Sequence, residues 1–432
     1  MPGLLNSSGR FKIASLFKLL MTIAMLLAFM PSLLKLGDSR LSVSYLYTIF
    51  CFAVMLLVLL RNRQLLIFYV HLAQQNKILF CSVLAMLLLH IASYAFYPAS
   101  GLMSRTLMAL IVFINAYLYF AFLLYRDDDD LQAFYKVINI GLIANFIVIL
   151  LYANGYQFLP NVELSYDRHA GLFSHPNQLA IVVSSIFVFY VGSYFNDTKP
   201  VNRIKSLVMF LVAVVVSIMA GSKTNILISG VILIVYLLWS VSRKNALIVL
   251  LSIVVLTLLL GFAGSSDLVL KLNPRLFSVV AELSLDNVMQ YRTVESRMVL
   301  WDYSWNTGMA YPYIGEGWGS SIFGKVEHSH NFFMDYLRLF GPLGLLSVGL
   351  FIVSLLALLS RGKLVTQHQH HLLKACKLSV LAYLLANMMS DSMGPQTAFF
   401  LAFFVAYLSA IPGRVYTFNP GSVYAARQVS MP

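Results

Sequence analysis

DYLRLFGPLGLLSVGLFIVSLLALLS, residues 335–360, is an apolar run long enough to cross a lipid bilayer, because a transmembrane helix needs about 20 mostly apolar residues. The chain holds about twelve runs of this kind, which predicts an all-α polytopic membrane protein. The predicted spans are residues 15–36, 42–60, 78–96, 103–125, 133–153, 178–195, 205–221, 225–241, 245–263, 335–360, 375–391 and 396–411.

Composition excludes a soluble globular protein. Of the 432 residues, 59% are hydrophobic and 11% charged, whereas soluble domains carry about 25% charged residues. Aromatic residues make up 14% and suit helix ends in the lipid headgroup region. The net charge of +13 is spread in twos and threes between apolar runs. It forms no basic stripe of the kind that binds nucleic acid, and lipid headgroups explain it better.

The longest polar stretch separates the ninth predicted span from the tenth, and it divides the chain into four parts. These are nine spans in residues 1–263, a large loop in 264–334, three spans in 335–411 and a tail in 412–432. Lys and Arg are concentrated in the loops on the side of the N-terminus, and such residues are retained in the cytoplasm. We therefore predict that both termini are cytoplasmic and that the large loop is extracytoplasmic.

Residues 64–77 begin apolar but contain His71, Gln74, Gln75 and Asn76. Four amide or imidazole groups so close together disfavour a full crossing of the hydrocarbon layer. We predict an interfacial helix here, and a re-entrant segment is the alternative.

The large loop ends in His328-Ser329-His330-Asn331, just before the tenth span. A histidine titrates near neutral pH, so His330 can accept the proton of a sugar hydroxyl as its oxygen attacks another group. His328 and Asn331 are candidate supporting residues. A histidine at a helix start can also be a cap or an interface residue.

Basic residues at the predicted outer ends of the spans suggest an anion site. Arg168 precedes Ser174 and Asn177, which can cap the sixth span and leave its N-terminus to attract a phosphate. Lys223, between the seventh and eighth spans, either contacts that phosphate or extends to lipid headgroups.

The large loop supplies the other candidates for this site. Arg292 and Arg297 precede a predicted amphipathic helix at residues 298–301, and a planar guanidinium can hold two oxygens of a diphosphate. Trp318 lies in a glycine-punctuated aromatic turn, residues 311–319, which either stacks on sugar rings or folds onto the membrane.

The spacing from His330-Asn331 to Gly341 and Gly344 is similar to the signature of the O-antigen ligase and polymerase superfamily. In that superfamily a histidine closes the large periplasmic loop and glycines follow in the next span. The resemblance extends to Arg297 with Leu300 and Trp301, to residues 312–319, to Gly171-Leu172-Phe173 with Pro176-Asn177, and to about twelve spans.

This resemblance implies a GT-C-like, metal-independent, inverting glycosyltransferase without a cofactor, in the inner membrane of a bacterium. Its donor would be a glycan on undecaprenyl diphosphate. Its acceptor would be lipid A-core for a ligase of lipopolysaccharide biosynthesis, or a second lipid-linked glycan for an O-antigen or exopolysaccharide polymerase. By resemblance His330 would activate the acceptor hydroxyl, while Arg297 and Arg168 would hold the diphosphate. Lys223 stands where many relatives have arginine.

Two other classes of protein remain open. A flippase for lipid-linked glycans, or another secondary transporter, would place ionisable groups within its spans, and this chain has few: His90, Asp335, Arg338 and Asp391. A membrane scaffold without chemistry would leave the histidine cluster unexplained. Ligases and polymerases share these motifs, so both activities stay open.

Overall fold

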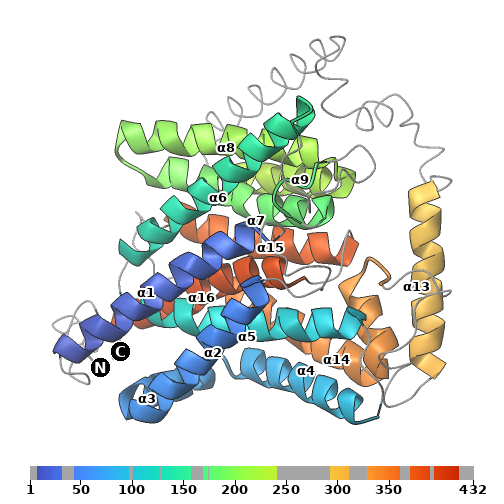
Figure 1. The fold of residues 1–432 in the computed structure, drawn as a ribbon, viewed down its shortest axis with the longest axis horizontal. Coiled ribbons are helices and arrows are strands. Elements are labelled where there is room, and N and C mark those ends of the chain that lie inside the picture. Colours follow the sequence, from blue (N-terminus) through green and yellow to red (C-terminus); the bar gives the residue numbers. More distant parts are fainter. Residues whose placement is uncertain are drawn as a thin grey trace, which may run out of the picture.

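The computed structural model describes residues 7–31, 43–96, 101–126, 129–156, 169–173, 175–240, 292–310, 328–360, 370–389 and 394–417, and these residues form thirteen helices and no strand (Figure 1). The helices are α1 (Ser7–Phe29), α2 (Val43–Arg61), α3 (Arg63–Gln75), α4 (Lys77–Phe96), α5 (Gly101–Arg126), α6 (Asp129–Ala153), α7 (Pro176–Asn196), α8 (Pro200–Ala220), α9 (Lys223–Ser240), α13 (Arg292–Ala310), α14 (Phe332–Ser360), α15 (His370–Met389) and α16 (Pro395–Thr417).

The all-α polytopic membrane fold is confirmed. Eight of the described helices are long and apolar enough to cross a membrane, and three shorter apolar helices lie at residues 13–29, 224–239 and 395–410. Every predicted span except 245–263 coincides with one of these eleven helices, and that span lies outside the described residues. The division into four parts and the GT-C-like architecture stay predictions.

The sequence accounts for where α7 and α8 begin and for where α8 ends. Proline is favoured at the first position of a helix because its missing N–H has no partner there, and α7 and α8 begin at Pro176 and Pro200. Helix α8 ends at Ala220 and is capped by Gly221, whose φ of 63° is the left-handed conformation that glycine tolerates.

The prediction that Asn177 caps α7 is wrong. Because Pro176 occupies the first helical position, the capping position falls on His175, whose Nδ1 accepts the backbone N–H of Asn177 at 3.2 Å. Asn177 is the second residue of the helix. Ser174, the other expected cap, lies outside the described residues.

Helix α7 forms the centre of the bundle, since all its residues from Pro176 to Ser193 are buried. It packs against α8, α9, α15 and α16, while α5 pairs with α16 and α4 with α14. Large apolar side chains stay exposed on the outer sides of α2, α4, α8 and α9. Such a surface is stable only where lipid covers it.

The α7–α15 contact gives a direct test of this packing. A methyl group on Gly192 would collide with the side chain of Ala375 and lie 3.1 Å from the carbonyl oxygen of His371. We expect Gly192→Ala to destabilise the protein by about 1–3 kcal/mol through overpacking, measured as thermal unfolding in detergent. The matched control is Gly230→Ala on α9, where the added methyl meets nothing within 4 Å. Equal stability of the two variants would contradict the packing.

Helix α3 is a separate helix of 13 residues, too short to span the membrane as a helix. One face is buried through Leu65, Tyr69 and Leu72, and the Tyr69 hydroxyl donates to the carbonyl of Leu118 on α5 at 2.9 Å. In Figure 1, α3 and the start of α1 lie toward one end of the bundle, and α13 lies across the opposite end. This relative arrangement agrees with the predicted sidedness; which end faces the cytoplasm stays a prediction.

Candidate functional site

Helix α14 carries the predicted histidine cluster at its N-terminus. Asn331 caps the helix, because its Oδ1 accepts the backbone N–H groups of Phe333 at 2.9 Å and Met334 at 3.3 Å. The helix is broken at Gly341, where φ is 63° and ψ is −160°. After the break, Gly344 lies against the carbonyl of Tyr336, with no room for a side chain. These two glycines shape the helix, and Asn331 starts it.

His330 has an unusual backbone. Its φ of 60° makes it the one non-glycine residue with positive φ among the described residues. This left-handed conformation costs an L-residue about 1–2 kcal/mol, and strain of this kind is concentrated at functional sites. The His330 N–H donates to Nδ1 of His328 at 3.3 Å, and the two imidazole rings meet edge to face with centroids 4.3 Å apart.

Ser329, the residue before His330, is fully buried and tied to two helices. Its backbone N–H and its hydroxyl both donate to Oδ1 of Asp335, at 2.7 and 2.8 Å. Its hydroxyl also lies 3.1 Å from the carbonyl oxygen of Asn331. Its own carbonyl accepts the indole N–H of Trp301 on α13 at 3.0 Å. Ser329, which leads into His330, is therefore fixed at its N–H and hydroxyl by Asp335 and at its carbonyl by Trp301.

Helix α13 lies across the N-terminal turns of α14. Close approach is possible because Gly308 has no side chain where it meets Leu337. One turn before Trp301, Arg297 donates from Nη1 to the carbonyl oxygen of Met389, the last residue of α15, at 2.6 Å.

Arg297 and Trp301 are four residues apart and so share one face of α13. The helical rise of 1.5 Å per residue separates their backbones by about 6 Å along the axis. Trp301 contacts the residue before His330. The structure thus places Arg297 about one helical turn from Trp301, the residue that contacts Ser329 next to His330. Sequence spacing alone does not indicate that α13 reaches this part of the chain.

The loop at residues 169–173 packs against α6 and against the C-terminal end of α8. The backbone N–H of His169 donates to the carbonyl of Met219 at 3.2 Å. The N–H of Leu172 donates to Oδ1 of buried Asn145 at 2.8 Å. Gly171 has a φ of 58°, and a Cβ there would lie 2.5 Å from the same oxygen. Residues 169–173 therefore lie next to the C-terminal end of α8, whose last residue, Ala220, is three residues before Lys223.

Burial governs the charge state of His169. Only 7% of this residue is exposed, and within the described part of the chain its Nδ1 has no hydrogen-bond partner. Burial lowers the pKa of the imidazole because the charged form loses its hydration. His169 is therefore neutral at pH 7 and adds no positive charge next to Arg168 in the sequence.

The N-terminal ends of α5, α7 and α16 meet at Gly394, just before α16. A Cβ on Gly394 would lie 3.2 Å from Nε2 of Gln178 and 3.5 Å from Nη2 of Arg105. Gly394 is five residues after Met389, so the Cα atoms of these two residues lie at most about 18 Å apart. Arg105 was not among the predicted site residues, and the only sequence signal for it was a lone basic residue at the start of a predicted span.

Not all predicted site residues are described. Arg168 and Trp318 lie outside the described residues, and the backbones of Lys223 and Arg292 begin α9 and α13 while their side chains are not described. Arg297 is partly exposed and His330 half-buried. Asp335, which the sequence marked only as an ionisable residue near a span, contacts the residue beside His330.

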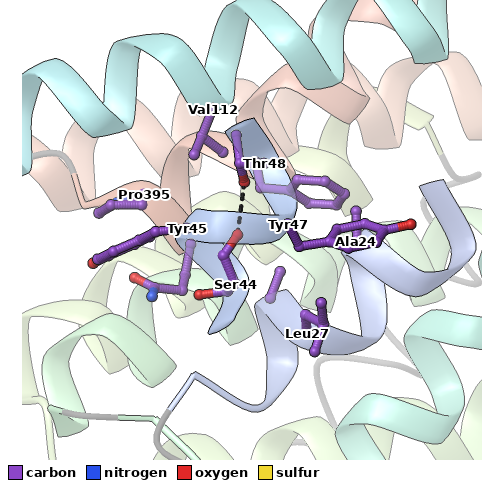
Figure 2. Close-up of a pocket in the computed structure, with 11 residues that line it drawn as sticks. Ala24, Leu27, Ser44, Tyr45, Tyr47, Thr48, Val112 and Pro395 are labelled. Carbon is purple, nitrogen blue, oxygen red and sulfur yellow. Dashed lines mark hydrogen bonds between the residues drawn. The ribbon is translucent and has the colours of Figure 1, made fainter. Parts of the chain in front are cut away.

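A separate pocket lies between α1, α2, α5 and α16, and Figure 2 shows its lining. Tyr45 and Thr48 of α2 face Val112 of α5 and Pro395 of α16, and the Thr48 hydroxyl donates to the Ser44 carbonyl at 2.9 Å. None of the predicted site residues lines this pocket. Because Pro395 follows Gly394, the pocket adjoins the meeting point of α5, α7 and α16.

Within the described residues, no group of three or more His, Cys, Asp or Glu side chains could hold a metal ion. The metal-independent reaction expected from the sequence is not tested by this and stays a prediction.

Comparison with known families identifies one segment. Residues 207–349 match the family model described as O-antigen ligase, which confirms the resemblance inferred from the histidine and glycine spacing. The segment runs from α8 into α14 and includes Lys223, Arg292, Arg297 and His330, whereas Arg168 precedes it. No curated protein matches the chain.

Proposed function

We propose that this chain, a multi-pass membrane protein with an O-antigen ligase domain at residues 207–349, transfers a glycan from undecaprenyl diphosphate to an acceptor sugar hydroxyl. The transfer takes place on the periplasmic face of the bacterial inner membrane. The acceptor is lipid A-core for a ligase, or a second lipid-linked glycan for a polymerase.

One observation carries this proposal. The strained His330 turn is held by Trp301, and Arg297 lies one turn before Trp301 on the same face of α13. This transfer needs two groups: a base that takes the proton of the acceptor hydroxyl, and a cation that stabilises the leaving diphosphate.

In the proposed reaction His330 takes the proton of the acceptor hydroxyl as the oxygen attacks the anomeric carbon. The new bond joins this carbon to the acceptor oxygen, and the bond between the carbon and the diphosphate oxygen breaks. Undecaprenyl diphosphate leaves with the electron pair, and His330 later releases the proton to water. Attack opposite the leaving group inverts the anomeric configuration.

The cationic residues act on the leaving group. Arg297 with Arg168 stabilises the negative charge that develops on the diphosphate, because fixed donors are worth more in a poorly hydrated site. Lys223 and Arg292, at the first positions of α9 and α13, add positive charge near the same end of the bundle. Trp318 stacks against the glycan, and His328 supports His330 through its contact with the His330 N–H.

The test is a transfer assay with purified protein in detergent, given a lipid-linked glycan donor and an acceptor. Because detergent removes the two compartments, a transferase forms product and a transporter does not. Absence of product together with facilitated movement of labelled donor in vesicles would overturn the proposal in favour of a flippase.

Loss of the gene separates the two transferase activities. Without a ligase, cells accumulate long chains on the lipid carrier. Without a polymerase, cells carry single repeats on the core.

A further inference from the structure

Asp335 is a fully buried carboxylate in the first turn of α14, one turn before the fully buried Arg338. A carboxylate is retained in such a place only where donors satisfy it. Oδ1 of Asp335 accepts two hydrogen bonds from one residue, Ser329, through the backbone N–H and the hydroxyl.

These bonds act on the backbone that sets the direction of the His330 ring. Asp335 binds the hydroxyl and the N–H of Ser329, and that N–H belongs to the peptide between His328 and Ser329. The indole of Trp301 binds the carbonyl of Ser329, which belongs to the peptide between Ser329 and His330. On the far side of His330, Asn331 is fixed as the cap of α14. A residue with positive φ needs such surroundings, since otherwise it relaxes to a more favourable conformation.

We propose that Asp335 is a positioning residue, which holds Ser329 so that the imidazole of the next residue, His330, points at the acceptor hydroxyl. This inference rests on the proposed function, because it assigns Asp335 a role through His330. Asp335 itself does not touch the substrate. Its contribution is the acceptor oxygen that it offers to Ser329, and its negative charge is not required for that.

Two substitutions separate the acceptor oxygen from the charge. Asp335→Asn keeps an oxygen for both Ser329 donors, whereas Asp335→Ala removes it. In the detergent assay we expect Asp335→Ala to lower kcat by up to about 100-fold, since a small misplacement of a reacting group has an effect of this size. The KM for the donor should stay within about twofold, and Asp335→Asn should restore most of kcat. The matched control is Asp302→Ala, which removes an exposed carboxylate on α13.

Ser329→Ala and Trp301→Phe test the hydrogen bonds that hold Ser329 while leaving the buried Asp335 carboxylate in place. The first removes the hydroxyl bond to Asp335 and keeps the N–H bond, and the second removes the indole bond to the Ser329 carbonyl. Each should lower kcat less than Asp335→Ala does. These variants decide the question if Asp335→Ala fails to fold, and wild-type kcat in both would then overturn the proposal.

The outcomes also separate this inference from the function on which it rests. If His330→Asn abolishes transfer while Asp335→Ala keeps wild-type kcat, the positioning role is wrong and the proposed function stands. If Asp335→Asn is as inactive as Asp335→Ala, the charge is required and the stated role is overturned. A rise in donor KM at unchanged kcat would make Asp335 a binding residue, which also overturns it. Full activity of His330→Asn would instead overturn the proposed function.

Discussion

Replacement of His330 by asparagine should abolish glycan transfer while the protein still folds and inserts. Asparagine is the most suitable replacement because it is polar and tolerates the left-handed backbone that His330 adopts, with a φ of 60°. It has no basic nitrogen, so it cannot take the proton of the acceptor. Loss of a general base lowers rates by about 10²- to 10⁴-fold, and initial rates of transfer in detergent measure this loss.

The control for this variant is His71→Asn on α3. His71 is paired with Gln75 at 2.9 Å on α3, the helix that Figure 1 shows near the end of the bundle opposite α13. We expect this variant to transfer at the wild-type rate. His330→Ala should be as inactive as His330→Asn. Transfer at the wild-type rate by either His330 variant would count decisively against His330 as the base.

The backbone strain at position 330, where φ is 60°, can be tested separately from the chemistry of the imidazole. Glycine has no penalty at positive φ, so His330→Gly should be more stable than His330→Ala by about 1 kcal/mol, measured by thermal unfolding in detergent. Both variants lack the imidazole, so a difference in stability reports on the backbone alone. Equal stability would mean that the turn relaxes when the ring is removed.

The helices were predictable because lipid imposes a simple rule on sequence. A segment that crosses hydrocarbon must be apolar and long, so apolar runs give the positions of α1, α2 and the other spans to within several residues. The break at Gly341 was also predictable, since glycine followed by proline cannot continue a regular helix. The start of α7 was predicted less well, because Pro176 moved the cap to His175.

The geometry of the candidate site was less accessible from sequence. Residue spacing marked His330 and Arg297 but does not indicate that Trp301 of α13 reaches Ser329, 28 residues away. The contact between Asp335 and Ser329 was also missed, although an acidic residue at the start of an apolar run was a usable signal. Such contacts depend on how separate helices pack, and a single sequence has no local pattern that encodes this packing.

Substitution of Arg297 is expected to have the second-largest effect. A hydrogen bond to a charged group contributes about 1.5–3 kcal/mol, so Arg297→Lys should lower kcat/KM by about 10- to 100-fold. Lysine keeps the positive charge but cannot present two parallel N–H groups to a diphosphate. The measurement is kcat/KM for the lipid-linked donor, and Arg63→Lys, an exposed arginine on α3, is the control.

Arg297 also anchors α13, since its Nη1 donates to the carbonyl of Met389 at 2.6 Å, and a third variant separates this role from diphosphate binding. Glutamine is neutral but still offers an N–H to that carbonyl, whereas lysine offers both an N–H and a charge. If Arg297 stabilises the leaving diphosphate, activity should fall from arginine to lysine and further to glutamine. If it serves only as an anchor, Arg297→Gln should be at least as active as Arg297→Lys, because a backbone carbonyl needs a donor and no net charge.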